Sequence, residues 1–405
     1  MTVSSSTVSY SVDPWDPGYG VAFGEELDGG ALDESSAELD LDLETPRAQW
    51  RPVDPDPATA RPGMVLFADG VRRIDARVWV HGTRPQPVPG IAASFAAGLV
   101  CCDGAARIGD LIVERGLFTA AAEASGITAG RVSYPARLAA GPAYEQLSLA
   151  LQQRLTHAEV QLALTYRAQN PAADDLLVID GPLRGRTHLD RAVGYIKSHH
   201  ASYLPPEQAA VVTALRPGQR TPAFTMGTSW RRTSWYLQLP GTMGVPWSGV
   251  VRLECSADLP VPEVSRLADL TARVLPPLAS VPHKDPRAPQ NLVPIGGLER
   301  ELRRRLGDQQ LLYRALRSAS AATWVTRPTM RSLSAASRSS VVATVSRVSG
   351  SRVPNPSSRN TEFRSRAPAD SWTTWRDSAR ARAREAWKVS PPDSVCTGRL
   401  AAASW

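Results

Sequence analysis

The sequence has few cysteines and no long apolar run. Its 405 residues include four Cys, which form no CxxC pair and show no regular spacing. This excludes a zinc ribbon and a disulfide-stapled scaffold, and it suits a reducing compartment. No run of about 18 apolar residues occurs, so no membrane span is predicted. The N-terminus lacks the charged-then-apolar pattern of a secretion signal. We therefore expect a cytoplasmic protein that does not bind a membrane.

Several familiar catalytic signatures are also absent. The sequence contains no GxxxxGK[ST] phosphate loop, no GxSxG nucleophile elbow and no HExxH zinc motif. These absences argue against a P-loop ATPase, a hydrolase built on that elbow, and a zinc metalloprotease. Any ATP-driven movement along a substrate would have to come from a partner subunit.

Lysine is scarce and charge is unevenly distributed. Three of the 46 basic residues are Lys and the rest are Arg, which is typical of a GC-rich coding bias and is weak evidence for DNA binding by itself. Residues 1–46 contain eleven Asp and Glu with no Lys or Arg, whereas residues 319–405 contain fourteen basic and five acidic residues. The middle of the chain is basic, which fits either a polyanionic partner or an ordinary soluble surface.

Composition divides the chain into three parts. Residues 1–50 are acidic and rich in turn residues, which predicts disorder. Residues 51–318 form the expected folded domain. Residues 319–405 are rich in Ser, Arg, Ala and Thr, show no hydrophobic period and contain five Trp. Two interpretations of this last part stay open: a basic disordered arm for nucleic acid, or a translated wrong reading frame, which the stray Trp residues favour. Neither predicts a packed domain.

The hydrophobic periods of the middle part predict a mixed α/β fold. A β-meander is expected over 62–120, with a turn at Asp69-Gly70, and a long helix over 143–169. The wholly apolar run 175–180 is typical of a central strand covered on both faces. Further strands are predicted over 222–226, 233–239 and 248–255, and helices after Thr187, over 262–275 and over 294–316. This order predicts a ribonuclease H-like mixed sheet flanked by helices.

Three carboxylates are the strongest candidates for chemistry. Asp69 and Asp180 each follow an apolar strand and precede a Gly, so both are expected at one edge of the sheet, and Glu159 lies on the helix that enters the second strand. Grouped carboxylates repel one another unless a cation lies between them. Mg²⁺ and Mn²⁺ prefer such ligands, and two such ions can stabilise phosphodiester cleavage. The alternatives are plain Asp-Gly turns and a solvated helix face for Glu159.

Basic and aromatic residues follow the same strands. Arg184, Arg186 and Lys197 flank the second carboxylate and could hold a phosphate backbone, or they could lie on a solvated surface. The segment 230–236 interleaves Trp and Tyr with Arg, a pattern that suits stacking of single-stranded bases. A strand with core aromatics is the favoured interpretation of that segment.

Five segments occur in an order and spacing that resemble one known family. They are Phe67-Ala-Asp69-Gly70, the helical Glu159, Leu177-Val-Ile-Asp180-Gly-Pro-Leu183, Gly194-Tyr-Ile-Lys197 and Asn291-Leu-Val-Pro-Ile-Gly-Gly-Leu-Glu299. Together, over about residues 62–316, they resemble the NurA nucleases. The resemblance implies a ribonuclease H-like, dimeric, Mn²⁺-dependent (or Mg²⁺-dependent) DNA nuclease with 5′ to 3′ exonuclease and single-strand endonuclease activity. It also implies a HerA-like hexameric ATPase as partner in DNA end resection and repair.

The resemblance assigns the metal-binding and catalytic roles to Asp69, Glu159 and Asp180. The family usually carries a Tyr-Pro pair followed by a His eight residues after the Tyr. Here those positions are Val293-Pro294 and Glu301. Glu301 can replace His as a ligand of a hard cation, whereas Val293 cannot replace a Tyr hydroxyl. Two hypotheses follow: a metal-dependent DNA nuclease, or a catalytically degenerate DNA-binding or scaffold protein on the same fold.

Overall fold

The computed structural model describes residues 9–12, 33–34 and 37–325, with gaps at 84, 172–173, 198, 200, 228–229, 242–246, 248, 282 and 286. Five strands at the centre of its large sheet lie in the order β6-β5-β4-β9-β10. Their bounds are β4 Met64–His81, β5 Val88–Cys102, β6 Ala106–Thr119, β9 Asp175–Asp180 and β10 Ala192–Ile196. β4, β5 and β6 are antiparallel, whereas β4, β9 and β10 are parallel. This is the strand order of a ribonuclease H-like sheet, so the predicted fold class is confirmed.

The sheet extends on both sides of this centre. Beyond β10 lie β14, β13, β12 and β3, and beyond β6 lie β8 and β7, while β1 pairs with the far end of β4 and β2 pairs with β11. The bounds of these strands are β1 Ser9–Val12, β2 Asp33–Glu34, β3 Glu38–Asp40, β7 Gly126–Ala129, β8 Val132–Leu138, β11 Ala201–Ser202, β12 Phe224–Gly227, β13 Arg231–Gln238 and β14 Val250–Ser256.

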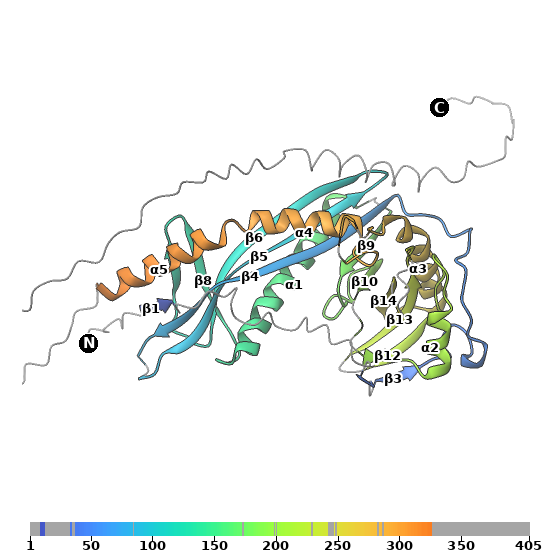
Figure 1. Cartoon of the computed structure of the whole chain (residues 1–405), viewed down its shortest axis with the longest axis horizontal. Coiled ribbons are helices and arrows are strands. Elements are labelled where there is room, and N and C mark those ends of the chain that lie inside the picture. Colours follow the sequence, from blue (N-terminus) through green and yellow to red (C-terminus); the bar gives the residue numbers. More distant parts are fainter. Residues whose placement is uncertain are drawn as a thin grey trace, which may run out of the picture.

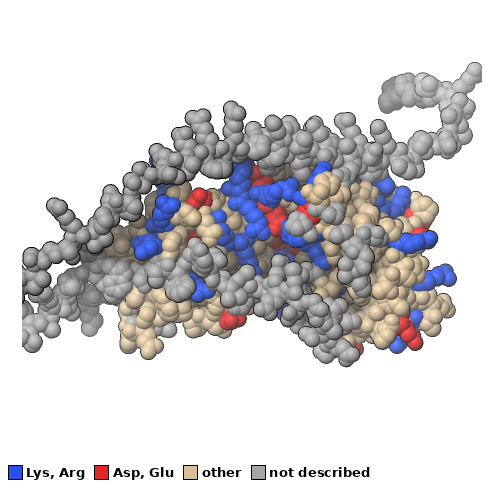
Figure 2. All heavy atoms as spheres, viewed as in Figure 1, with Lys and Arg blue, Asp and Glu red and all other residues tan. Residues whose placement is uncertain are grey.

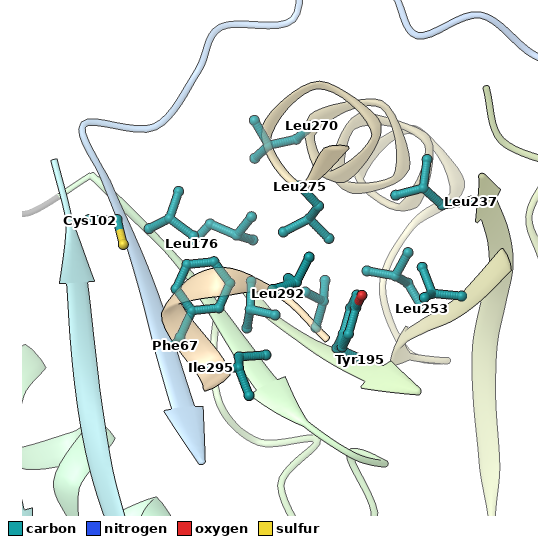
Figure 3. Close-up of a cluster of buried hydrophobic side chains, with 14 of the residues drawn as sticks. Phe67, Cys102, Leu176, Tyr195, Leu237, Leu253, Leu270, Leu275, Leu292 and Ile295 are labelled. Carbon is teal, nitrogen blue, oxygen red and sulfur yellow. The ribbon is translucent and has the colours of Figure 1, made fainter. Parts of the chain in front are cut away.

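Helices cover both faces of the sheet. They are α1 Tyr144–Gln169, α2 Pro206–Thr213, α3 Val261–Val274, α4 Val293–Arg305 and α5 Gln309–Val325, with short 3-10 turns at Arg47–Gln49 and Pro276–Leu278. Figure 1 shows α4 running along the long strands β4–β6. Alternate residues of β4 enter two cores. Val65 and Phe67 pack with α3 and α4 (Figure 3), whereas Leu66 and Ala68 pack with α1.

Three local predictions are wrong, two because tertiary packing outweighs the local pattern and one because a glycine ends the helix. β4 does not turn at Asp69-Gly70: both residues keep their register with Gly98 and Ala97 of β5. The helix expected after Thr187 is instead the strand β10, which is buried between β9 and β14. The helix expected over 294–316 is broken into α4 and α5 at Gly307, which has a φ of +83°.

The folded part begins before residue 51 and ends after residue 318. β3 pairs with β12, and Leu41 and Trp50 are buried, with the Trp50 indole donating a hydrogen bond of 2.9 Å to the Leu41 carbonyl. The Glu44 carboxylate pairs with Arg220 at 2.8 Å. The expected disorder therefore does not extend over residues 37–50, and α5 continues past residue 318. Residues 1–8, 13–32 and 326–405, which include most of both expected tails, lie outside the described residues.

Three of the four cysteines lie in the described part of the chain. Cys101, Cys102 and Cys255 are buried free thiols, and Cys396 lies outside the described residues. No helix in the described part of the chain is long and apolar enough to cross a membrane.

Candidate functional site

Asp69 is a buried carboxylate in the middle of the sheet. It shares a β4 face with Phe67 and Val71, and this face packs against α4. Its carboxylate accepts a hydrogen bond of 2.7 Å from the backbone N–H of Gly70, and no ion pair reaches it within the described residues. Burial raises the pKa of Asp69 well above its ordinary value, and the negative charge of Asp180 adds to the effect.

Asp180 lies beside Asp69. β9 runs parallel to β4 with Ile179 opposite Ala68, so the next residue of each strand is an aspartate. The Lys197 ammonium, just after β10, lies 2.6 Å from the Asp180 carboxylate. Burial raises the pKa of Asp180, while Lys197 acts in the opposite direction. The structure thus places Asp69, Asp180 and Lys197 together, with one ammonium beside two buried carboxylates.

Glu159 approaches the same place from the opposite face. It lies on α1, which packs against the face of β4 that carries Leu66 and Ala68. A Cβ atom added at Gly70 would lie 2.6 Å from Glu159 Oε1, so the missing side chain leaves room for this carboxylate. Glu159 is buried, which excludes a solvated helix face. Burial raises its pKa to about 7 even though Arg186 forms an ion pair with it.

The three predicted phosphate-binding residues have different surroundings. Arg184 is exposed in the loop after β9, and the Lys197 side chain is about one-fifth exposed. Arg186 is buried: its guanidinium pairs with Glu159 and donates hydrogen bonds to the Pro182 carbonyl at 3.0 Å and the Thr156 hydroxyl at 3.2 Å. Arg186 therefore binds Glu159 and is not exposed to a phosphate. This corrects the prediction that Arg186 holds a phosphate backbone.

The carboxylate that α4 brings to the site is Glu299 and not Glu301. Glu301 accepts hydrogen bonds from Arg304 and Arg305 of its own helix, which hold its pKa at about 2. Glu299 contributes negative charge at both Asp69 and Asp180. Residues that are two positions apart on an α-helix point to nearly opposite sides, so only one of Glu299 and Glu301 can face the carboxylates of the sheet. The family-like segment 291–299 ends at Glu299, but the metal role was predicted for Glu301.

Arginines surround this carboxylate group. Glu299 pairs with Arg287 at 2.5 Å and with Arg303 at 2.9 Å, and both arginines are substantially exposed. Burial alone would raise the pKa of Glu299, but these two guanidinium groups outweigh it and lower the pKa. Figure 2 shows the same arrangement at larger scale, with Lys and Arg side chains gathered around a group of Asp and Glu on one face of the molecule. An anionic polymer would meet positive charge at the rim of an acidic centre.

The donor set suits a hard divalent cation, but the side chains do not converge. Asp69, Asp180 and Glu159 offer carboxylate oxygens, the ligands that Mg²⁺ and Mn²⁺ prefer. Among the described residues, however, no group of three or more His, Cys, Asp or Glu is arranged to hold a metal ion. Glu159 is turned to Arg186 and Asp180 to Lys197. Holding a cation would require Glu159 to leave Arg186, and Asp180 to use the carboxylate oxygen that does not contact Lys197.

The aromatic segment on β13 is mostly core. Trp235 and Tyr236 are fully buried, which confirms the interpretation of a strand with core aromatics. The partly exposed Trp230 lies against the Arg232 guanidinium, with 4.8 Å between the charge centre and the ring centroid.

Replacing Gly70 by Ala is expected to destabilise the protein and displace Glu159. The new Cβ would lie 2.6 Å from both Glu159 Oε1 and Leu155 Cδ1. Overpacking of this kind costs about 1–3 kcal/mol. Urea unfolding measures the loss, and Gly109→Ala is the matched control, because its Cβ would meet its nearest atom at an ordinary 3.5 Å. Equal stability of the two variants would contradict the close approach of Glu159 to Gly70.

Comparison with known proteins finds a distant structural likeness. No protein-family model matches the chain, and no curated protein matches it. Among solved structures, the chain is similar to the NurA nuclease from Sulfolobus solfataricus, with 11% sequence identity and a TM-score of 0.36. The match covers 64% of this chain and 85% of that chain. A likeness this distant carries no inference about chemistry, so function has to come from the residues of the site.

Proposed function

We propose that this chain is a divalent-metal-dependent nuclease that hydrolyses phosphodiester bonds of DNA. The observation that carries the proposal is the pair of buried neighbouring aspartates, Asp69 and Asp180, on the two central strands. Burial raises the pKa of both, the charge of Asp180 raises that of Asp69 further, and the Lys197 ammonium lowers both. Such a pair lowers the stability of the fold, and groups with perturbed pKa values are concentrated at functional sites.

Each residue has a defined part in this proposal. Asp69, Asp180 and Glu159 hold the cation, Mn²⁺ or Mg²⁺, once Glu159 leaves Arg186. A cation bound there supplies the Lewis acidity and the activated water by which metal ions promote phosphodiester cleavage. Lys197 and Arg184 contact the phosphate backbone, and Glu299 holds Arg287 and Arg303 at the rim of the site. Exonuclease polarity of 5′ to 3′, single-strand endonuclease activity, a HerA-like ATPase partner and a homodimer belong to the same proposal.

A second candidate function is DNA binding without cleavage. Two observations favour it: Arg186 and Lys197 already neutralise two of the three expected metal ligands, and Val293 opens α4 without a hydroxyl group. In this case the basic rim would bind phosphates while the carboxylates stay in their ion pairs. A site that has exchanged a metal ion for Arg and Lys would have a scaffolding role.

A nuclease assay on end-labelled linear DNA separates the two functions. We expect the 5′ label to be released as short nucleotides in Mn²⁺, and in Mg²⁺ more slowly or equally, but not in EDTA. A 3′ label and a circular single strand then report polarity and endonuclease activity. Binding that weakens steeply with salt, since phosphate contacts release counterions, but with intact ends in both metals, would support the second candidate and contradict the first.

A further inference from the structure

The loop that precedes α4 carries a continuous chain of polar contacts into the site. Asn291 is fully buried, and its side-chain carbonyl accepts a hydrogen bond of 3.2 Å from the Lys197 ammonium. On its other side, the Asn291 amide group donates a hydrogen bond of 2.5 Å to the Asp285 carboxylate. Lys197 is therefore held from two directions, by Asp180 of β9 and by Asn291 of this loop.

The same chain continues to the rim of the site. The second oxygen of Asp285 accepts a hydrogen bond of 2.8 Å from the backbone N–H of Arg287. The Arg287 guanidinium in turn pairs with Glu299 at 2.5 Å. Four residues thus join the carboxylate of Asp180, on the central sheet, to the carboxylate of Glu299, on the helix that covers it. They are Lys197, Asn291, Asp285 and Arg287.

The fold leaves room for the hydrogen bond between Asn291 and Asp285 and fixes the backbone of Asn291. A Cβ atom at Gly296 would lie 3.0 Å from the Asn291 amide nitrogen and 3.2 Å from an Asp285 oxygen, so a side chain there would crowd both groups unless they shift by a few tenths of an ångström. The backbone N–H of Asn291 donates to the Arg287 carbonyl at 3.0 Å. A buried Asn held in this way accepts from a cation on one side and donates to an anion on the other, which neither a carboxylate nor a hydrocarbon can do.

We propose that Asn291, oriented by Asp285, is a positioning residue that fixes the Lys197 ammonium beside Asp180. Lysine has a long flexible stem and a compact charge, so its place in a site depends on the groups that hold it. The consequence for activity rests on the proposed nuclease function, in which Lys197 contacts the phosphate. The placement of Lys197 itself does not depend on that function.

The first test observes Lys197 directly by NMR of ¹⁵N-lysine ammonium groups. The chain has three Lys, so Lys284→Arg and Lys388→Arg assign the signals. We expect a slowly exchanging Lys197 ammonium signal in the wild type, lost in Asn291→Asp because the new carboxylate would repel Asp285. The combined variant Asn291→Asp/Asp285→Asn reverses the donor and acceptor of the pair and should restore it. A Lys197 signal that is unchanged in Asn291→Asp, or not restored in the combined variant, would overturn the proposal.

The second test asks whether Asn291 acts through Lys197. A misplaced catalytic group costs up to about 100-fold in rate, so Asn291→Asp and Asp285→Asn should lower kcat about 10- to 100-fold, with a much smaller change in KM for DNA. The combined variant should recover most of the rate. On a Lys197→Met background the same substitutions should have little further effect, and a full additional loss there would refute the positioning role. A wild type that cleaves no DNA refutes the nuclease function, while the lysine signal still decides the placement.

Discussion

Replacing Asp69 by Asn is expected to abolish DNA cleavage and to make the protein more stable. The loss of activity should be roughly 100- to 1,000-fold, the scale on which removal of one electrostatic group acts in a catalytic site. The gain in stability follows from burial without an ion pair of its own within the described residues, because the Asn side chain keeps the shape and removes a charge that the fold disfavours. Each pKa unit by which folding raises a carboxyl is worth about 1.4 kcal/mol. Thermal unfolding and the end-labelled assay measure the two effects.

The pH dependence of this gain has a defined sign. Folding raises the pKa of Asp69, so the folded state holds the proton more tightly than the unfolded chain. The favourable contribution of the protonated group is complete below the unfolded pKa and is lost as pH rises through the folded pKa. The advantage of Asp69→Asn over the wild type should therefore be large at pH 8 and shrink toward pH 4. Urea unfolding at both pH values tests this.

Asp175 provides the matched control for Asp69. It is also a buried aspartate of a central strand, but Arg167 pairs with it at 2.8 Å and Arg191 at 3.1 Å. Asp175→Asn should therefore lower the free energy of unfolding, because it leaves the partly buried Arg167 guanidinium without its counter-ion. It should leave Mn²⁺-dependent cleavage by the folded fraction intact. An Asp69→Asn protein that is less stable than the wild type, or that still cleaves, would contradict the proposed site.

The sequence correctly predicts those elements in which the local hydrophobic pattern agrees with the burial in the folded protein. The wholly apolar run that ends at Asp180 is a central strand, and the spacing of Leu151, Leu155 and Leu162 places one face of α1 on the sheet. Because this strand was predictable, so was the position of Asp180 at its end, whereas Asp69 lies within β4 and not at the strand end expected from the sequence. Glu159 was predicted on the correct helix, but its burial and its pairing with Arg186 depend on a loop that folds back over α1.

Other features depend on contacts that no local pattern contains. Asp69-Gly70 has the composition of a turn, yet the strand continues because Gly70 gives room to Glu159 and Leu155 from the opposite face. The choice between Glu299 and Glu301 depends on which side of α4 faces the sheet, and the packing of Ile295, Leu298 and Leu302 into the core sets that side. A helical period alone cannot tell the two glutamates apart.

Replacing Arg186 by Met is expected to cause the largest loss of stability. The substitution keeps much of the side-chain volume but leaves the Glu159 carboxylate buried without its partner, and breaking such a pair costs about 3–5 kcal/mol. Arg184→Met is the control, because Arg184 is exposed in the same loop and its loss should leave the free energy of unfolding nearly unchanged. Urea unfolding of the two variants gives the comparison.

Protons and divalent cations should each rescue Arg186→Met, and this links the buried pair to the proposed metal site. The pKa of Glu159 is already raised to about 7, and loss of Arg186 should raise it further. A raised folded pKa means that stability is kept at low pH and lost as pH rises through that value, so the defect should be small at pH 5 and full near pH 9. Glu159→Gln on the same background should remove this pH dependence. If Glu159 is a metal ligand, Mn²⁺ should raise the Tm of Arg186→Met more than that of the wild type, because the cation no longer competes with a guanidinium. An equal effect of Mn²⁺ on both proteins would remove Glu159 from the metal-binding set and favour the DNA-binding function without cleavage.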